Sequence, residues 1–176
     1  SKESDTYTLQ SAVIFEDPLK PDAVETYKEL SDLGINVKVI TGDSLQVAEY
    51  VGNILHPVIM DKFAFSMDGW KPDGTNAIED YFVYARCKPE QKSELIDEHL
   101  DHGVVGFLGE GINDAMALKR ADIGFVVNNG SDVARQSGDV LLLEKSLNPV
   151  IAAVTMSREA FLKIRTYLLC TLTGNI

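Results

Sequence analysis

Apolar residues along the chain follow two patterns, short continuous runs and positions that recur every three to four residues. The runs are typical of buried strands, and the recurring positions are typical of helices with one buried face. The predicted strands are residues 8–15, 35–40, 81–85, 104–108, 123–127 and 140–143. The predicted helices are residues 21–33, 45–55, 89–102, 113–120, a short segment between 127 and 140, and 148–169. This alternation predicts an α/β fold with a parallel sheet and helices on both faces.

Two stretches fall outside the alternation. Residues 56–80 have a weak apolar pattern and frequent glycine and proline, so we expect a connection with little regular structure there. Residues 1–8 are mostly polar and have the character of a linker. The α/β domain is therefore expected to begin at about residue 9 and to end before the long C-terminal helix.

Composition narrows the class of protein without changing this fold. The chain has 176 residues, 45% of them hydrophobic and 24% charged, which is ordinary for one globular domain. Its net charge of −11 argues against nucleic acid as a general partner, although a nucleotide could still bind at one local site. Cys87 and Cys170 lie far apart and predict neither a zinc site nor a disulfide, which fits a reducing compartment. Neither a secretory signal nor an apolar run of bilayer-spanning length is visible in the sequence.

Side chains capable of chemistry follow three of the predicted strands at the point where each strand ends. Because the carboxyl ends of parallel strands meet at one edge of a sheet, these side chains should face one crevice. They are Thr41, Gly42 and Asp43 after the strand 35–40, Arg86 and Lys92 after 81–85, and Glu110, Asn113 and Asp114 after 104–108.

This set of groups suits phosphoryl transfer, which depends on positioning and on the stabilisation of charge. A threonine hydroxyl and backbone N–H groups can bind a phosphoryl oxygen, and Lys92 can offset its charge. The carboxylates of Glu110 and Asp114 can hold Mg²⁺. Each group alone also has a simpler interpretation, since Thr41 and Asp43 could be helix caps and Lys92 a surface lysine.

The order of these motifs resembles the phosphorylation domain of P-type cation-transporting ATPases, which has a haloacid dehalogenase-like fold. The resemblance extends from about residue 9 to residue 176 and rests on the combination of motifs, since each motif alone is weak. Details at residues 105–109 and 142–145 are most similar to the magnesium-transporting branch. The motifs are Asp17-Pro18, Thr41-Gly42-Asp43, Ala85-Arg86 with Pro89-Glu90-Gln91-Lys92, and Gly109-Glu110-Gly111-Ile112-Asn113-Asp114-Ala115, with further family-like stretches at 121–124, 131–134 and 139–145.

The resemblance implies a role for each site residue. Thr41 would bind the phosphoryl group, and Lys92 would stabilise it during transfer. Asn113 and Asp114 would complete the catalytic site, and Glu110 and Asp114 would hold Mg²⁺, with ATP as the substrate. The residues implied on the nucleotide and hinge side are Asp17, Gly42, Asp43 and Arg86, of which Asp17 could also be a plain turn residue before a proline.

At the scale of the whole protein, the resemblance implies an ATP-driven membrane cation pump that works through an aspartyl-phosphate. Residues 9–147 would be the C-terminal part of its phosphorylation domain, and residues 148–176 a helix that leads to a transmembrane segment. The chain would lie on the cytoplasmic side of the membrane. Its partners would be ATP, the transported cation, and the nucleotide-binding, actuator and membrane domains of the pump, without nucleic acid.

One part of the family pattern is missing, because the nucleophile motif Asp-Lys-Thr-Gly occurs nowhere in the chain. In the family this motif lies upstream, beyond an inserted nucleotide-binding domain. The chain alone is therefore expected to form no phosphoenzyme. Without the central strand that carries the motif, two neighbouring strands would have unpaired edges, which predicts strain, modest stability, or another chain that fills the gap.

A second departure lies at the metal site, where Glu110 stands in place of the aspartate usual in the family. The extra methylene moves the carboxylate by about 1.5 Å. Since Mg²⁺ demands near-ideal octahedral geometry, weaker or water-mediated binding is expected.

These departures leave two alternatives to a pump. The chain could be a non-catalytic module that binds Mg²⁺ or a partner, because it lacks the nucleophile. It could also be a haloacid dehalogenase-type phosphatase, but such enzymes carry the nucleophile near the N-terminus of the same domain. Asp5 and Asp17 are the only aspartates in residues 1–17 that could take that place, and Asp17 lacks the second acid two positions later.

Overall fold

The computed structural model describes residues 10–11, 18–57, 63–72, 81–144 and 146–173. The helices are α1 (Ala23–Asp32), α2 (Leu45–Leu55), α3 (Pro89–Leu100), α4 (Ala115–Arg120), α5 (Asp132–Ser137) and α6 (Asn148–Thr173), with a short 3₁₀ helix, η1 (Ile112–Asp114), before α4. The strands are β1 (Val39–Ile40), β2 (Ala64–Ser66), β3 (Val83–Ala85), β4 (Gly106–Gly109), β5 (Ile123–Val127) and β6 (Val140–Leu142). Most of the predicted strand 8–15, together with Asp5 and Asp17, lies outside the described residues.

Local sequence explains where several helices begin and end. Ser131 caps α5 because its hydroxyl accepts a hydrogen bond from the N–H of Ala134 at 3.2 Å. Helix α3 begins at Pro89, whose fixed φ suits the first helical position. Gly34, at φ +74°, follows α1 in the left-handed conformation that ends many helices.

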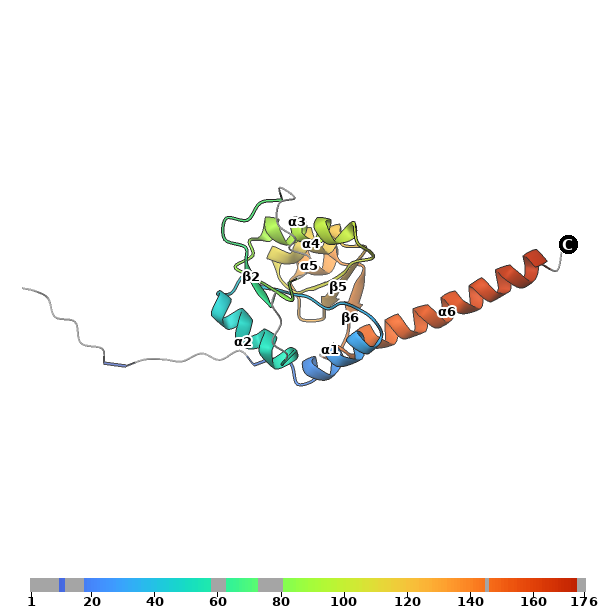
Figure 1. The fold of residues 1–176 in the computed structure, drawn as a ribbon, viewed down its shortest axis with the longest axis horizontal. Helices are drawn as coiled ribbons and strands as arrows, with labels where there is room; N and C mark the ends of the chain where they lie inside the picture. Colours follow the sequence, from blue (N-terminus) through green and yellow to red (C-terminus); the bar gives the residue numbers. More distant parts are fainter. Residues whose placement is uncertain (1–9, 12–17, 58–62, 73–80, 145, 174–176) are drawn as a thin grey trace, which may run out of the picture.

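The strands form two parallel three-stranded sheets, one in the order β1–β3–β2 and one in the order β4–β5–β6. Ile40 lies opposite Tyr84 in the first sheet, and Leu108 lies opposite Phe125 in the second. Figure 1 shows α3, α4 and α5 on one side of the strands and α1 and α2 on the other. The predicted α/β architecture with parallel strands and helices on both faces is therefore confirmed.

The described part of residues 56–80 has little regular structure, as predicted, but it contains one short strand that the sequence did not indicate, β2. Its residues pair with β3, where Ala64 lies opposite Val83 and Ser66 opposite Ala85. The N–H of Met67 extends the pairing to the carbonyl of Ala85 at 2.9 Å. A strand of three residues is too short to produce a pattern of its own, so its conformation comes from the neighbour with which it pairs.

Two predicted strands are shorter than their apolar runs. Of the run 35–40, only Val39 and Ile40 pair with β3, opposite Val83 and Tyr84. In the run 104–108, the N–H of Val105 donates instead to the carboxylate of Asp122 at 2.8 Å. The ladder with β5 then extends from Gly106 to Gly109.

Among the described residues, three groups of buried side chains form the core, and α3 contributes to two of them. Leu95 packs with Met67 and Tyr84 of the first sheet region. The next residue, Ile96, packs with side chains of β4, α4, β5 and α5. Ile40 contacts both groups, so β1 and α3 together join the two sheets into one body.

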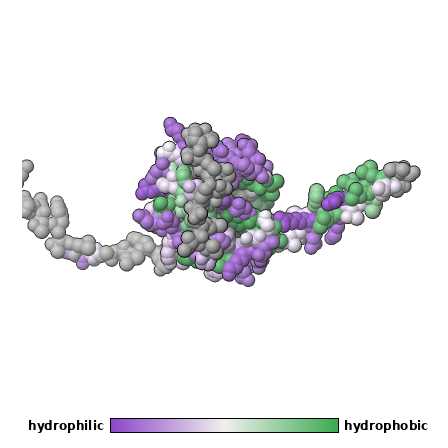
Figure 2. All heavy atoms as spheres, viewed as in Figure 1, coloured by the Kyte–Doolittle hydropathy of each residue, from purple (hydrophilic) through white to green (hydrophobic). Residues whose placement is uncertain are grey.

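Helix α6 is longer than predicted and leads away from this body (Figure 1). None of its residues is fully buried. Figure 2 shows hydrophobic side chains gathered over its far half. Within the described part of the chain, no helix combines the length and apolar character needed to cross a membrane.

Candidate phosphoryl-transfer site

The loop after β1 is held by its own side chains and by the loop after β3. The Thr41 hydroxyl donates to the Asp43 carboxylate at 2.8 Å and accepts from the Asp43 N–H at 3.1 Å. The carbonyl oxygens of Thr41 and Asp43 accept bonds from the N–H groups of Cys87, at 3.0 Å, and Arg86, at 2.9 Å. This double connection fixes the loop 41–43 against the loop that leads into α3.

Arg86 makes this connection possible through its backbone. Its φ is +56°, in the left-handed region that side chains disfavour, and no other non-glycine residue in the described ranges has a positive φ. Its guanidinium donates to the Asp68 carboxylate at 2.7 Å, with both side chains more than half exposed. The left-handed conformation turns the chain so that two successive N–H groups point at the loop 41–43.

Lys92 and Asp114 meet across the gap between α3 and the loop after β4. The Lys92 Nζ donates to Asp114 Oδ1 at 2.7 Å, and only 14% and 12% of the two side chains is exposed. The N–H groups of Glu110 and Gly111 donate to Asp114 Oδ2 at 3.1 and 3.0 Å. The carboxylate of Asp114 thus holds the lysine ammonium and closes the loop 110–114 at the same time.

The charge of Asp114 is favoured by these contacts. Burial alone would raise the pKa of its carboxyl, but hydrogen bonds from Lys92, Gly111 and Glu110 and the positive charge of Lys92 together hold the pKa below its usual value. Asp114 is therefore a permanent anion at neutral pH. Removing it would leave the ammonium of Lys92 largely buried without its partner.

Gly109 is needed for this arrangement. A Cβ at this position would lie 2.7 Å from the Cβ of Asp114 and 3.1 Å from the ring of Phe107. The end of β4 can therefore approach Asp114 only because residue 109 has no side chain.

Glu110 and Asn113 occupy the same loop but are both exposed. The backbone of Glu110 is fixed, since its carbonyl accepts a bond from the N–H of Ser131 at 2.8 Å and its N–H donates to Asp114. No group of three or more His, Cys, Asp or Glu side chains with metal-binding geometry occurs among residues that the structure describes. Two carboxylates in one loop still fit Mg²⁺, which often takes one or two carboxylates together with phosphate oxygens.

The structure thus brings the predicted residues into two groups. The first group is the loop after β1 and its backbone contact, and it consists of Thr41, Gly42, Asp43 and the backbone of Arg86. The second group surrounds the loop after β4, and it consists of Lys92, Glu110, Asn113 and Asp114. Asp17 lies outside the described residues and cannot be assigned to either group.

Cys87 connects the two groups, and no signal in its sequence context pointed to this position. Its N–H donates to the carbonyl of Thr41, and the positive charge of Lys92 lowers the pKa of its buried thiol. Burial raises the pKa of the thiol to about 12, more than the Lys92 charge and a hydrogen bond with Thr41 lower it. The thiol is therefore protonated and unreactive at neutral pH, and Cys87 acts as a packing residue.

Asp68, the ion-pair partner of Arg86, was also not predicted from the sequence, because it lies in the stretch expected to be irregular.

Comparison with known proteins identifies related chains. The family model described as haloacid dehalogenase-like hydrolase matches residues 2–122. A magnesium-transporting P-type ATPase of Salmonella typhimurium is 35% identical over 96% of this chain, and a probable copper-exporting P-type ATPase of Archaeoglobus fulgidus is 34% identical over 96%. The chain spans 19% and 18% of the lengths of these two relatives. The nearly equal identities do not separate the magnesium-transporting branch from the copper-exporting one, so that assignment stays a prediction.

A solved structure gives the same result for the fold. The crystal structure of a zinc-transporting PIB-type ATPase matches 86% of this chain with a TM-score of 0.68 and 26% sequence identity. The match covers 21% of that protein. The likeness to P-type ATPases therefore holds for the three-dimensional fold as well as for the sequence.

Proposed function

The chain belongs to the haloacid dehalogenase-like hydrolases, and we propose that it is the phosphorylation-domain part of an ATP-driven membrane cation pump. The pump would work through an aspartyl-phosphate, with the nucleophilic aspartate outside this chain. Relatives that match nearly the whole chain are named as magnesium-transporting and copper-exporting P-type ATPases, which supports this proposal.

The observation that carries the proposal is the largely buried pair of Lys92 and Asp114 at the sheet edge. An ammonium held this way keeps a fixed position and cannot be replaced by water without cost. A fixed positive charge is what stabilises the charge that develops on a transferring phosphoryl group. Lys92 would therefore act on the phosphoryl oxygens, and Asp114 would orient it.

The loop 41–43 would supply the second contact with the phosphoryl group. Thr41 follows β1 directly, and its hydroxyl is already positioned by Asp43. By turning away from Asp43, this hydroxyl could donate to a phosphoryl oxygen at the same sheet edge. The nucleotide and the hinge to the nucleotide-binding domain would lie on the side of the site formed by Gly42, Asp43, Arg86 and Asp17.

Mg²⁺ would be held by Glu110 and Asp114, and it would neutralise phosphate charge. A carboxylate has about four lone-pair positions, and Asp114 already uses three of them for hydrogen bonds. The exposed side chain of Glu110 is therefore the freer ligand of the two. Asn113, exposed in the same loop, would complete the site.

The division of the sheet supports a nucleophile strand from outside the chain. Strand β1 is at the end of one three-stranded sheet and β4 is at the end of the other. Among the described residues, no strand pairs with both. A parallel strand between β1 and β4 would place its carboxyl end beside Thr41 and the loop 110–114.

The proposal extends to the place of the chain in the cell. Residues 9–147 would belong to the phosphorylation domain on the cytoplasmic side of a membrane. Helix α6 would lead toward a transmembrane segment. The transported cation would then bind in membrane helices, and the remaining domains of the pump would contact this one.

Phosphorylation of the protein made from the complete reading frame tests the proposal. With radiolabelled ATP, we expect an acid-stable phosphoenzyme whose formation is slowed about a hundredfold or more by Lys92→Ala, with nucleotide binding nearly unchanged. Lys119→Ala, which removes an exposed lysine of α4, is the matched control and should behave as wild type. A phosphoenzyme on the 176-residue chain alone, or its equal formation by Lys92→Ala, would contradict the proposal.

A further inference from the structure

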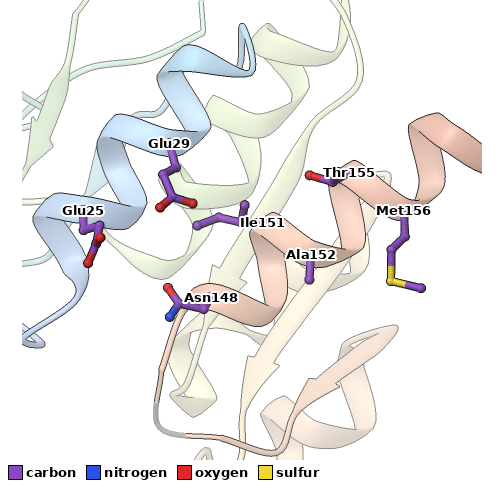
Figure 3. A pocket seen from close by; sticks show the side chains of 7 residues that line it. All are labelled: Glu25, Glu29, Asn148, Ile151, Ala152, Thr155 and Met156. Carbon is purple, nitrogen blue, oxygen red and sulfur yellow. The ribbon is translucent and has the colours of Figure 1, made fainter.

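A groove away from the phosphoryl site lies between α1 and the first turns of α6 (Figure 3). Its volume is about 390 Å³. The groove is lined by Glu25 and Glu29 of α1 and by Asn148, Ile151, Ala152, Thr155 and Met156 of α6. It shares no residue with the candidate phosphoryl site, so the two can be tested separately.

The walls of this groove are fixed at both ends. At the start of both helices, Asp22 Oδ2 accepts bonds from the Ser146 hydroxyl at 2.8 Å and from the Leu147 N–H at 2.6 Å. Further along, the Arg158 guanidinium donates to the carbonyl of Leu33 at 2.6 Å. Helices held at two such points keep their spacing, so the groove exists before any partner arrives and little ordering is needed for binding.

One wall of the groove is acidic. Glu25 and Glu29 lie one turn apart, are both exposed, and form no ion pair with any residue that the structure describes. Figure 3 shows both side chains on the side of α1 that faces α6. Like charges one helical turn apart destabilise a helix, so a cation between them would relieve this repulsion.

The other wall, on α6, is mostly apolar apart from Asn148 and Thr155, and an exposed apolar side chain extends it beyond the groove. Ile151 and Ala152 lie in the groove, and Met156 at its edge is 69% exposed. Leu162, about two turns after Thr155 on the same face of α6, is 56% exposed. Exposed apolar side chains that adjoin a preformed groove are typical of a protein–protein contact.

We propose that this groove binds a basic amphipathic helix of a partner protein. Lysine or arginine side chains of that helix contact Glu25 and Glu29, and its apolar face covers Ile151, Met156 and Leu162. An acidic wall beside an apolar wall selects this chemistry, because a purely apolar helix leaves the two carboxylates unpaired and a purely basic one leaves the apolar side chains in water.

A synthetic helix tests this proposal directly on the 176-residue chain. The probe is a fluorescein-labelled peptide of about five turns, with lysine along one face and leucine along the other. We expect saturable binding by fluorescence anisotropy, weakened at high salt. The double variant Glu25→Gln/Glu29→Gln should lower the affinity about fivefold, and Met156→Gln should also lower it.

The matched control is Glu94→Gln/Glu98→Gln, which removes the same charge from two glutamates one turn apart on α3. Its affinity should stay within about twofold of wild type, because charges away from the groove are screened. Equal losses in the two double variants would overturn the proposal, since the peptide would then sense only the net charge. Absence of binding, or self-association of the chain that competes with the peptide, would overturn it as well. Unchanged thermal unfolding of the variants shows that they are folded.

Discussion

The backbone and the side chain of Arg86 affect the stability of the folded chain in separate ways. Its left-handed φ of +56° costs free energy for any side chain, and its guanidinium contacts Asp68 at the surface. The backbone conformation aligns the N–H groups of Arg86 and Cys87 with the loop 41–43. Strain of this kind persists where the surroundings determine the conformation, and it is concentrated at functional sites.

Two substitutions of Arg86 should separate these effects. Arg86→Ala keeps the strain and loses the ion pair, whereas Arg86→Gly loses the ion pair but removes the strain. We expect the glycine variant to be more stable than the alanine variant by about 1 kcal/mol. Urea unfolding of the three proteins measures this difference. An alanine variant at least as stable as the glycine variant would mean that the left-handed conformation is absent in solution.

The Asp114 carboxyl should make stability depend on pH. Its pKa is below the usual value in the folded chain, so its contribution is fully present above the unfolded pKa and is lost as pH falls through the folded pKa. Asp114→Asn should therefore be least stable relative to wild type at pH 7, and the difference should shrink below about pH 4.

Urea unfolding of wild type and Asp114→Asn across this pH range checks the expectation. Asn113→Ala, an exposed change in the same loop that removes no titrating group, should differ from wild type by a constant amount. A difference for Asp114→Asn that does not vary with pH would contradict the contribution of its lowered pKa.

At the residue scale, the sequence was informative for one pair of side chains at the candidate site. Lys92 and Asp114 could be assigned to one sheet edge from the order of strands alone. The roles of Cys87 and Asp68 could not be predicted, because they depend on the path of the loop after β3. A backbone φ such as that of Arg86 leaves no trace in the pattern of apolar and polar residues.

At the scale of elements, helices were predicted better than strands. Apolar spacing and Pro89 indicated the start of α3, since these signals are local. Strand β2 and the true length of β1 depend on pairing with β3, which is fixed by the tertiary fold. An apolar run therefore indicates where a strand can form, and the neighbouring strand decides how much of it does.

The attachment of α6 to α1 gives a prediction at this scale. The Asp22 carboxylate accepts two bonds from residues 146 and 147, and these bonds lower its pKa. Asp22→Ala should release the start of α6 at a cost of about 1–2 kcal/mol, since one lost acceptor leaves an N–H and a hydroxyl unpaired.

Hydrogen–deuterium exchange followed by mass spectrometry measures this release. Residues 146–158 should exchange faster in Asp22→Ala, and β4 and β5 should exchange as in wild type. Asp32→Ala, an exposed change at the opposite end of α1, is the control and should leave residues 146–158 unchanged. Faster exchange throughout the chain in Asp22→Ala would instead indicate global destabilisation.

At the scale of the whole molecule, the division into two sheets predicts a response to an added strand. A peptide that contains Asp-Lys-Thr-Gly after an apolar run should insert between β1 and β4 if the proposed function is right. Binding only to the folded chain raises the midpoint of thermal unfolding in a saturable way. A peptide with proline at alternate positions of the run cannot pair and should have no effect. Equal effects of the two peptides would contradict insertion as a strand.

The position of α3 has a consequence for how the site could be controlled. Leu95 packs into one sheet region and Ile96 into the other, so neighbouring residues of one helix span the division between them. Lys92 lies about one turn earlier on the same helix. Any rotation of one sheet relative to the other would turn α3 and move the Lys92 ammonium away from Asp114. The contact between Lys92 and Asp114 would then depend on the relative orientation of the two sheets, and the proposed site would be assembled only in one orientation.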